Sequence, residues 1–421
     1  MAHMTPYGSD VPFAEPGWYR GIASPYYNQS HVEFRARIRA FVDKELLPNV
    51  NRWEEECVQQ GKEVPFRELV KKAYQARVLA PMYPEEVGGT PLPNGVKFDS
   101  FHDLIWIDEL SRCGASGLIA CLTIYTMALP PIYKYGSAEV RAKVVKPVLT
   151  GEKGIALCIT EPTAGSDMAG LQTTAERITE NGQEYYLVNG QKKWITMAVA
   201  ADFFTVAVRT GKAGHGGVSV LMVERDTPGI SVRRLKLQGN YTAGTGVVTF
   251  DNVKVPVGNL LGKEGEGFKI IAANLNHERL TISVQAIRQC RLCISESIDF
   301  ARQRKTFGKR LIDHQVVRHK IAEMARLTEA SWAMAESLAF SLDNHATDTQ
   351  IAGPMALFKV MTSKTFELCA REASQVLGGA SYTREGKGQV VERLYREVRS
   401  YAIPGGSEEI LLDFAMKSAK L

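Results

Sequence analysis

Apolar residues recur at helical spacing through both ends of the chain. In the first 150 residues this pattern predicts four helices, and prolines follow the first and the last of them. These predicted helices cover residues 32–47, 66–78, 101–111 and 119–129. After Gly267 helical spacing returns and predicts three long helices, at residues 270–302, 315–342 and 353–377. Helices of this length favour a helical bundle.

The middle of the chain is different, because short β-rich runs alternate there with turns. Tyr185–Val188 is a predicted strand, and Asn189-Gly190 directly after it predicts a hairpin turn. Further strands are predicted at residues 203–208, 218–223 and 246–250. We therefore expect three consecutive domains. They are a helical domain at 27–153, a β domain at 154–264 and a helical bundle at 265–421.

Composition excludes several classes of protein. With 45% hydrophobic and 23% charged residues among 421, the chain is typical of a globular protein and not of a disordered one. No uncharged apolar run of about 18 residues predicts a membrane span. The net charge of +5 is spread along the chain, without a basic arm for nucleic acid. Cys290 and Cys293 lack further ligands, so no metal site is predicted.

The C-terminal tripeptide resembles a targeting signal. Ala419-Lys420-Leu421 is a variant of the Ser-Lys-Leu tripeptide that directs proteins to peroxisomes. It predicts a peroxisomal protein, with the mitochondrial matrix or the cytoplasm as alternatives.

Two segments of the β domain could bind a ligand without a charged side chain. In LCITEPTAGSDMAG (157–170) a predicted strand ends at Thr160, and turn amides and hydroxyls follow at Gly165-Ser166. Such groups can bind a phosphate or the edge of a heteroaromatic ring. In KWIT (193–196) a hydroxyl lies two residues after a tryptophan. No Rossmann GxGxxG, phosphate loop, GxSxG or HExxH motif occurs.

ITEPTAGSD and KWIT together resemble the flavin-binding segments of the acyl-CoA dehydrogenase family. The similarity continues through RQRKTFGKRLIDHQ (302–315), QVLGG (375–379) and YREVRSYAIPGGSEEI (395–410), and it covers about residues 30–418. The resemblance implies an α+β fold with an N-terminal helical domain, a middle β-barrel-like domain and a C-terminal four-helix bundle. It also implies FAD as the cofactor.

The resemblance assigns the flavin to two groups of residues. One group lines the isoalloxazine ring and the phosphates, and Thr160 and Thr196 would donate to the polar edge of the ring. Its members are Leu157, Ile159, Thr160, Gly165, Ser166, Trp194 and Thr196. The other group would reach the adenine half of FAD from a neighbouring subunit, which implies a homotetramer built as a dimer of dimers. Its members are Arg304, Phe307, Gln315, Gln375 and Gly379, and Ser407 and Glu409 complete the predicted cofactor set.

The family needs a carboxylate that removes the α-proton of an acyl thioester. Many members carry it as the glutamate of a Glu-Gly-Thr/Ser run, where this chain has Gly405-Gly406-Ser407. A subset, including isovaleryl- and long-chain-type enzymes, carries it on the first helix after the β domain, in a Glu-Arg-Leu run. Here that run begins at Glu278, which we predict to be the base, with the Gly405 N–H directed at the thioester oxygen.

Ser166 and Arg279 are the predicted substrate contacts, whereas Glu408 and Glu409 are rival carboxylates. The resemblance thus predicts an FAD-dependent dehydrogenase that converts an acyl-CoA to its trans-2-enoyl-CoA in fatty-acid or branched-chain β-oxidation. An electron-transfer flavoprotein or O₂ would take the electrons. Two alternatives stay open. One is a nitroalkane-type flavin oxidase, which would carry an aspartate base. The other is a non-catalytic relative that binds flavin or nucleic acid, although no basic cluster supports it.

Overall fold

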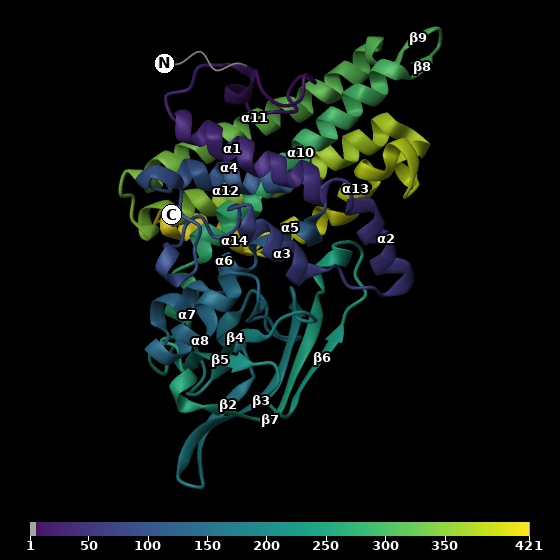
Figure 1. Cartoon of the computed structure of the whole chain (residues 1–421). Helices are drawn as coiled ribbons and strands as arrows, with labels where there is room; N and C mark the ends of the chain where they lie inside the picture. Colours follow the sequence, from purple (N-terminus) through teal and green to yellow (C-terminus); the bar gives the residue numbers. More distant parts are fainter. Residues whose placement is uncertain (1–5, 421) are drawn as a thin grey trace. The chain divides into compact units, whose positions relative to one another are not determined.

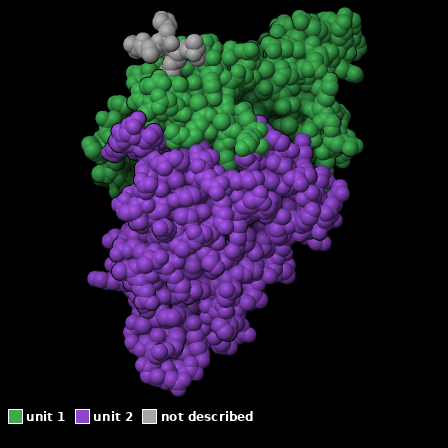
Figure 2. All heavy atoms as spheres, viewed as in Figure 1, with its two compact units in different colours: residues 1–44, 99–116, 276–421 green, residues 45–98, 117–275 purple. Residues whose placement is uncertain are grey.

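The structure is a computed structural model that describes residues 6–420 (Figure 1). Its contacts divide the chain into two compact units, each assembled from segments that are distant in sequence. Unit 1 comprises residues 1–44, 99–116 and 276–421, and unit 2 comprises residues 45–98 and 117–275 (Figure 2). The three domains expected from the sequence are consecutive segments, whereas each of these units combines distant segments. The boundaries of the three domains therefore stay a prediction.

Unit 1 is helical. Its helices are α1 (Gln29–Phe41), α4 (Ser100–Leu110), α10 (Leu275–Gln303), α11 (Gln315–Asp343), α12 (Asp348–Leu377), α13 (Gln389–Ala402) and α14 (Glu408–Ser418). Helix α12 packs against α11, α13 and α14, while α4 packs against α1 and α11. Between α10 and α11 the chain forms a short hairpin of β8 (Lys305–Thr306) and β9 (Lys309–Arg310).

The predicted long helices are present, with differences at their ends. The helix expected at 270–302 is two helices, α9 (Gly267–Ala272) and α10, because residues 273–274 interrupt the helix. The helix expected at 32–47 is α-helical as far as Phe41 and continues as a wider π-helical turn, Val42–Leu46.

Unit 2 is built on one seven-stranded sheet. Its strands are β1 (Ile155–Cys158), β2 (Thr174–Glu180), β3 (Gln183–Ile195), β4 (Phe203–Arg209), β5 (Val218–Glu224), β6 (Ile230–Arg234) and β7 (Gly246–Pro256). The strand order is β1-β4-β2-β3-β7-β6, and β5 pairs with β4. Only β1–β4 and a single β2–β4 pair are parallel. Tyr186, Phe204 and Val248 belong to the core of this unit and are fully buried.

The predicted hairpin at Asn189-Gly190 is wrong. Strand β3 runs straight through these residues, and the turn between β2 and β3 lies at Asn181-Gly182, whose positive φ angles of 52° and 77° suit a two-residue hairpin loop. Gly190 instead lies at an irregularity in the pairing of β3 with β7. A Cβ atom there would approach the Thr173 side chain to 2.6 Å, so the position requires glycine.

The helices of unit 2 precede or flank the sheet. They are α2 (Val50–Gln60), α3 (Phe66–Gln75), α5 (Ser116–Thr123), α6 (Tyr125–Ala128), α7 (Pro130–Tyr135), α8 (Ala138–Leu149) and α9. The helix expected at 119–129 is thus split in two, and Pro130-Pro131 opens α7, where a missing N–H costs little. Within residues 6–420 no single helix is long and apolar enough to cross a membrane. Helix α5 together with α6–α7 reaches that length and composition only as a pair of helices bent by 43°.

Candidate active site

In unit 2 the two ligand-binding segments predicted from the sequence are hydrogen-bonded to each other. The N–H of Lys193 donates to the carbonyl of Thr160 at 2.9 Å, which places KWIT beside the end of β1. Thr160 and Thr196 are both partly exposed. Trp194 is 50% exposed and has a positive φ of 60°, so an indole lies open to solvent in a strained backbone conformation. Exposed hydroxyls beside an exposed aromatic suit a flat ligand with a polar edge.

A buried ion pair holds these segments in place. Lys192 Nζ lies 2.7 Å from Glu161 Oε1 and donates to the carbonyl of Ile159 at 3.0 Å. The Glu161 carboxylate also accepts the backbone N–H groups of Gln172, at 2.6 Å, and Thr173, at 2.9 Å. Burial alone would raise the pKa of Glu161, but the Lys192 charge and the hydrogen bonds outweigh it and lower that pKa. The pair therefore ties the loop after β1 to strand β3 with a charged carboxylate.

In unit 1 the Glu-Arg-Leu run meets the turn that contains Gly405. Glu278 is 8% exposed in the first turn of α10. Arg279 Nε donates to the carbonyl of Gly405 at 3.1 Å. Among residues 6–420 the Gly405 N–H donates to no acceptor. A buried carboxylate and an unpaired backbone donor thus lie on segments that the chain brings together across 126 positions.

The start of α10 is anchored to the rest of unit 1. His277 Nε2 lies 2.9 Å from Asp103 Oδ2 on α4. The side-chain amide of Asn276 donates to the carbonyl of Asp348 at 3.2 Å, at the start of α12. These contacts hold the first turn of α10, and with it Glu278, against two other helices.

A pocket of about 650 Å³ lies wholly in unit 1, where α10 and α12 end. Its lining includes two cationic side chains, Arg304 and Lys387, and two glycines, Gly378 and Gly379. A Cβ atom on Gly378 or Gly379 would meet nothing within 4 Å, so the glycines leave open room that side chains would fill. Cations beside open space fit an anionic ligand, such as an adenine nucleotide.

Comparison with known proteins identifies the chain. Three family models match consecutive parts of it: the acyl-CoA dehydrogenase N-terminal domain at residues 28–152, the middle domain at 156–253 and the C-terminal domain at 265–420. The acyl-CoA dehydrogenase apdG of Emericella nidulans is 41% identical over 97% of this chain and 95% of its own length. The chain belongs to the acyl-CoA dehydrogenase family.

Two further relatives are similar to this chain over most of their length. The crystal structure of acyl-CoA dehydrogenase from Geobacillus kaustophilus has a TM-score of 0.85 and 32% identity, and it covers 95% of this chain and 100% of its own. The caffeyl-CoA reductase–Etf complex subunit CarC of Acetobacterium woodii is 31% identical over 91% of this chain and 97% of its own length. The predicted fold, with N-terminal helical, middle β and C-terminal helical domains, is confirmed, and the chain is an oxidoreductase acting on CH–CH bonds.

The acyl-CoA dehydrogenase motifs located only some of the residues that line the 650 Å³ pocket of unit 1. Arg304 and Gly379 line it, whereas Phe307, Gln315 and Gln375 do not. Phe307 is 97% exposed at the tip of the β8–β9 hairpin, and Gln315 and Gln375 are also exposed. The motifs missed Lys387, whose Nζ donates to Gln303 Oε1 at 2.8 Å, because it lies outside the matching segments.

The remaining predicted residues lie on exposed or half-buried segments of this dehydrogenase. Gly165 and Ser166 are exposed in the loop after β1, and Leu157 and Ile159 are half-buried beside it. Ser407 caps α14 by position, and Glu409 in its first turn is exposed. Glu408, one of the two rival carboxylates, forms an ion pair with Lys364 at 3.2 Å.

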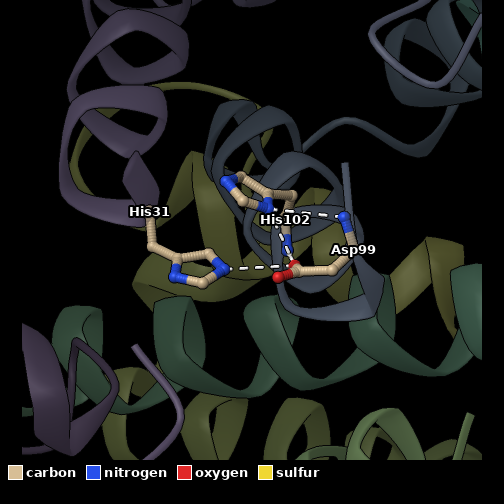
Figure 3. A group of neighbouring side chains, drawn as sticks. All are labelled: His31, Asp99 and His102. Carbon is tan, nitrogen blue, oxygen red and sulfur yellow. Dashed lines mark hydrogen bonds and ion pairs between the residues drawn. The ribbon is translucent and has the colours of Figure 1, made fainter. Parts of the chain in front are cut away.

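One group of potential metal ligands lies in unit 1, where the starts of α1 and α4 lie side by side (Figure 3). Within residues 6–420, His31, Asp99 and His102 form the one His/Cys/Asp/Glu group whose ligand atoms all lie within 4.8 Å of one another. Asp99 Oδ1 lies 3.1 Å from His31 Nε2 and 2.7 Å from His102 Nδ1. Burial alone would raise the pKa of Asp99, but hydrogen bonds from His102 and His31 outweigh it and lower that pKa.

Helix capping accounts for this group. Asn28 and Asp99 are the N-caps of α1 and α4; His31 accepts the backbone N–H of Asn28 through Nδ1, whereas the Nδ1–H of His102 donates to the Asp99 carboxylate. The distance is 3.0 Å for His31, so its remaining proton lies on Nε2 and points at Asp99. A metal ion at Nε2 would need that proton removed. We therefore assign these residues to the packing of α1 on α4.

Proposed function

We propose that this acyl-CoA dehydrogenase removes the α-proton of an acyl-CoA thioester with Glu278 and produces the trans-2-enoyl-CoA. The observation that carries the proposal is the meeting, inside unit 1, of the Glu278–Arg279 run with the Gly405 turn. The α-carbon of a thioester is a weak acid, so the reaction needs a base shielded from water and a donor for the developing enolate. Glu278 is buried, and the Gly405 N–H has no other acceptor within residues 6–420.

FAD is the proposed cofactor, and it would accept the β-hydride of the substrate. In unit 2, Thr160 and Thr196 would donate to the polar edge of the flavin ring, beside the exposed Trp194. In unit 1, Arg304 and Lys387 would hold the anionic part of the cofactor of a neighbouring subunit. We assign Phe307, which is 97% exposed on the hairpin tip, to the contact with that second subunit. We propose a homotetramer with one FAD per subunit, which sedimentation and the absorbance of the purified protein test.

Glu278→Gln tests the proposed base. The variant keeps the size and hydrogen bonding of the side chain but removes its basicity, so it should still bind FAD and acyl-CoA. Flavin reduction, followed anaerobically by stopped flow with acyl-CoAs of graded length, should slow by about four powers of ten, roughly 5 kcal/mol of barrier.

Glu139→Gln is the matched control, because Glu139 also lies in the first turn of a helix but is exposed. It should reduce flavin at the wild-type rate. Near wild-type reduction in Glu278→Gln would contradict the assignment, and Glu408→Gln and Glu409→Gln would then be compared in the same assay.

The pathway and the location are further parts of the proposal. We propose that the enzyme acts in fatty-acid or branched-chain β-oxidation in peroxisomes, directed by Ala419-Lys420-Leu421, of which Leu421 lies outside the described residues. A fluorescent protein carrying the last ten or so residues should enter peroxisomes, and the same fusion without Leu421 should stay diffuse. A diffuse signal from both fusions would contradict the address.

The electron acceptor is proposed to be an electron-transfer flavoprotein or O₂. The first is supported by the relative from Acetobacterium woodii, whose name places it in a complex with Etf. Mixing the substrate-reduced enzyme with each acceptor in turn separates the two, since the physiological acceptor should reoxidise the flavin faster.

A further inference from the structure

A buried lysine lies beneath the turn that contains Gly405. Lys359 belongs to α12 and is 1% exposed. Its Nζ donates to the carbonyl of Ala402 at 2.6 Å and to the carbonyl of Gly406 at 2.8 Å. No motif pointed to this residue, because its role depends on contacts between α12 and a turn more than forty positions away.

The two carbonyls stand at opposite ends of one short turn. Ala402 is the last residue of α13, so its carbonyl is among those that a helix leaves without an intrahelical partner. Gly406 lies two residues before α14 begins. An ammonium group at this place satisfies the exposed carbonyl and complements the negative end of the helix dipole.

A third carbonyl of the same turn is held from another helix. Arg279 Nε donates to the carbonyl of Gly405. The turn between α13 and α14 is five residues long, and side-chain donors from α10 and α12 therefore fix three of its peptide groups. Pro404 restricts the chain further, because its ring fixes φ.

The peptide group that joins Pro404 to Gly405 carries the unpaired N–H of Gly405. It lies between the fixed carbonyl of Ala402 and the fixed carbonyls of Gly405 and Gly406. Gly405 and Gly406 have positive φ angles of 73° and 110°, in the region that only glycine occupies freely. Two adjacent glycines would let this turn sample many conformations if its carbonyls were not held.

The surroundings of Lys359 are unfavourable for a charge. Burial lowers its pKa to about 8, and the charges of Arg279 and Arg399 act in the same direction, against that of Glu408. A buried ammonium beside two guanidinium groups costs stability. The cost is understandable if the bonds of the ammonium serve the reaction as well as the fold.

We propose that Lys359 is a positioning residue for acyl-CoA dehydrogenation, which holds the 403–407 turn so that the Gly405 N–H stays directed at the thioester oxygen. The proposal rests on the proposed function of Glu278 and Gly405. It assigns no proton transfer to Lys359, which acts through the turn and does not touch the reacting atoms.

Lys359→Met tests the proposal, because methionine keeps an unbranched apolar stem and removes the donor. Lys364→Met is the matched control, since Lys364 lies on the same helix but pairs with the Glu408 side chain and not with the turn carbonyls. Two measurements are made on each holoenzyme. They are hydrogen exchange of the peptide that covers residues 403–407, and stopped-flow flavin reduction over a range of acyl-CoA concentrations.

In Lys359→Met we expect exchange of that peptide to speed up by about tenfold, while a peptide from β3 and β4 is unchanged. The limiting rate of flavin reduction should fall on the order of 10²-fold, as for loss of one oxyanion donor, while acyl-CoA affinity and FAD content change less than about threefold. Lys364→Met should match the wild type in both measurements. If Lys359→Met does not fold, Lys359→Gln, which can still reach one carbonyl, should give intermediate values.

Three outcomes overturn the proposal. Unchanged exchange at 403–407 would show that the turn does not need Lys359. Faster exchange with an unchanged limiting rate would show a structural role only. A proportional loss of rate, affinity and FAD would show general damage to the fold. If no acyl-CoA reduces the wild-type flavin, the proposed function itself fails, and the exchange result then reports on the turn alone.

Discussion

Glu15 offers a sharp test of the electrostatics of unit 1, because its carboxylate is buried between two arginines. It lies in the segment before α1, ahead of the part that matches the N-terminal domain model. Oε1 lies 2.9 Å from Arg39 Nη1, and Oε2 lies 2.9 Å from Arg288 Nη1. The two arginines also pair with Glu109 and Asp108, so Glu15 connects α1 and α10 within a larger ionic network.

The size of the effect follows from the pKa of Glu15. Burial alone would raise this pKa, but the charges of Arg288 and Arg39 and their hydrogen bonds outweigh burial and lower it from 4.5 to about 2. One pKa unit corresponds to about 1.4 kcal/mol, so the ionised carboxylate should contribute about 3 kcal/mol to the free energy of unfolding at neutral pH. Because the folded pKa is depressed, this contribution is complete above about pH 4.5 and is lost as the pH falls toward 2.

Glu15→Gln removes the charge and keeps the shape. Urea unfolding at pH 7 should show a loss of about 3 kcal/mol, and the difference from the wild type should shrink steadily between about pH 4.5 and 2. Glu33→Gln is the control, because Glu33 is exposed on α1 and its carboxylate accepts a hydrogen bond from the uncharged Gln29. It should change stability by less than about 0.5 kcal/mol. A Glu15→Gln difference that does not depend on pH would refute the electrostatic explanation.

Two further predictions concern buried lysines. Lys192→Met leaves the Glu161 carboxylate buried without its cation, so it should cost about 3–5 kcal/mol of stability and lower the FAD content. Lys193→Met, the control, removes a cation that stacks on Trp194 and should keep FAD. Equal FAD content in the two variants would contradict the role of the Lys192–Glu161 pair. Lys359 has a folded pKa of about 8, below its usual 10.5, so between these pH values the unfolded chain binds more protons than the folded one. The stability of the wild type relative to Lys359→Met should therefore rise by up to about 3 kcal/mol from pH 8 to 10.5. A flat difference in urea unfolding across that range would show that the ammonium is not desolvated.

The order of helices and strands was predictable from the sequence, because hydrophobic spacing reports which face of each element is buried. The wrongly predicted hairpin turn shows what hydrophobic spacing and local propensity cannot determine. The predicted β domain contains two Asn-Gly pairs, at 181–182 and 189–190, and both follow β-prone residues. Which Asn-Gly pair forms the hairpin turn depends on how the two strands pair, since β2 (Thr174–Glu180) aligns with Gln183–Asn189. Register is a property of two strands together, so local propensity could not choose between the pairs.

The candidate site shows the same division. Motif resemblance located Glu278, Gly405 and Arg304, which stand within the matching segments. It did not find Lys359, Lys387 or the partnership of Glu161 with Lys192, because each depends on a contact between distant segments. A buried lysine has no sequence signature of its own, since its spacing along a helix looks the same whether its ammonium reaches water or a carbonyl.

The geometry at residue 405 supports the proposal that the base of this enzyme lies on α10. The φ of 73° at Gly405 strains any residue that has a side chain, and a Cβ atom there would lie 3.0 Å from Ile282 Cδ1. A glutamate at this position would have to displace a buried isoleucine and bend the turn that Lys359 and Arg279 hold. With glycine there, the turn can instead present its backbone N–H. The carboxylate must then come from another element, and Glu278 lies next to the arginine that bonds this same turn.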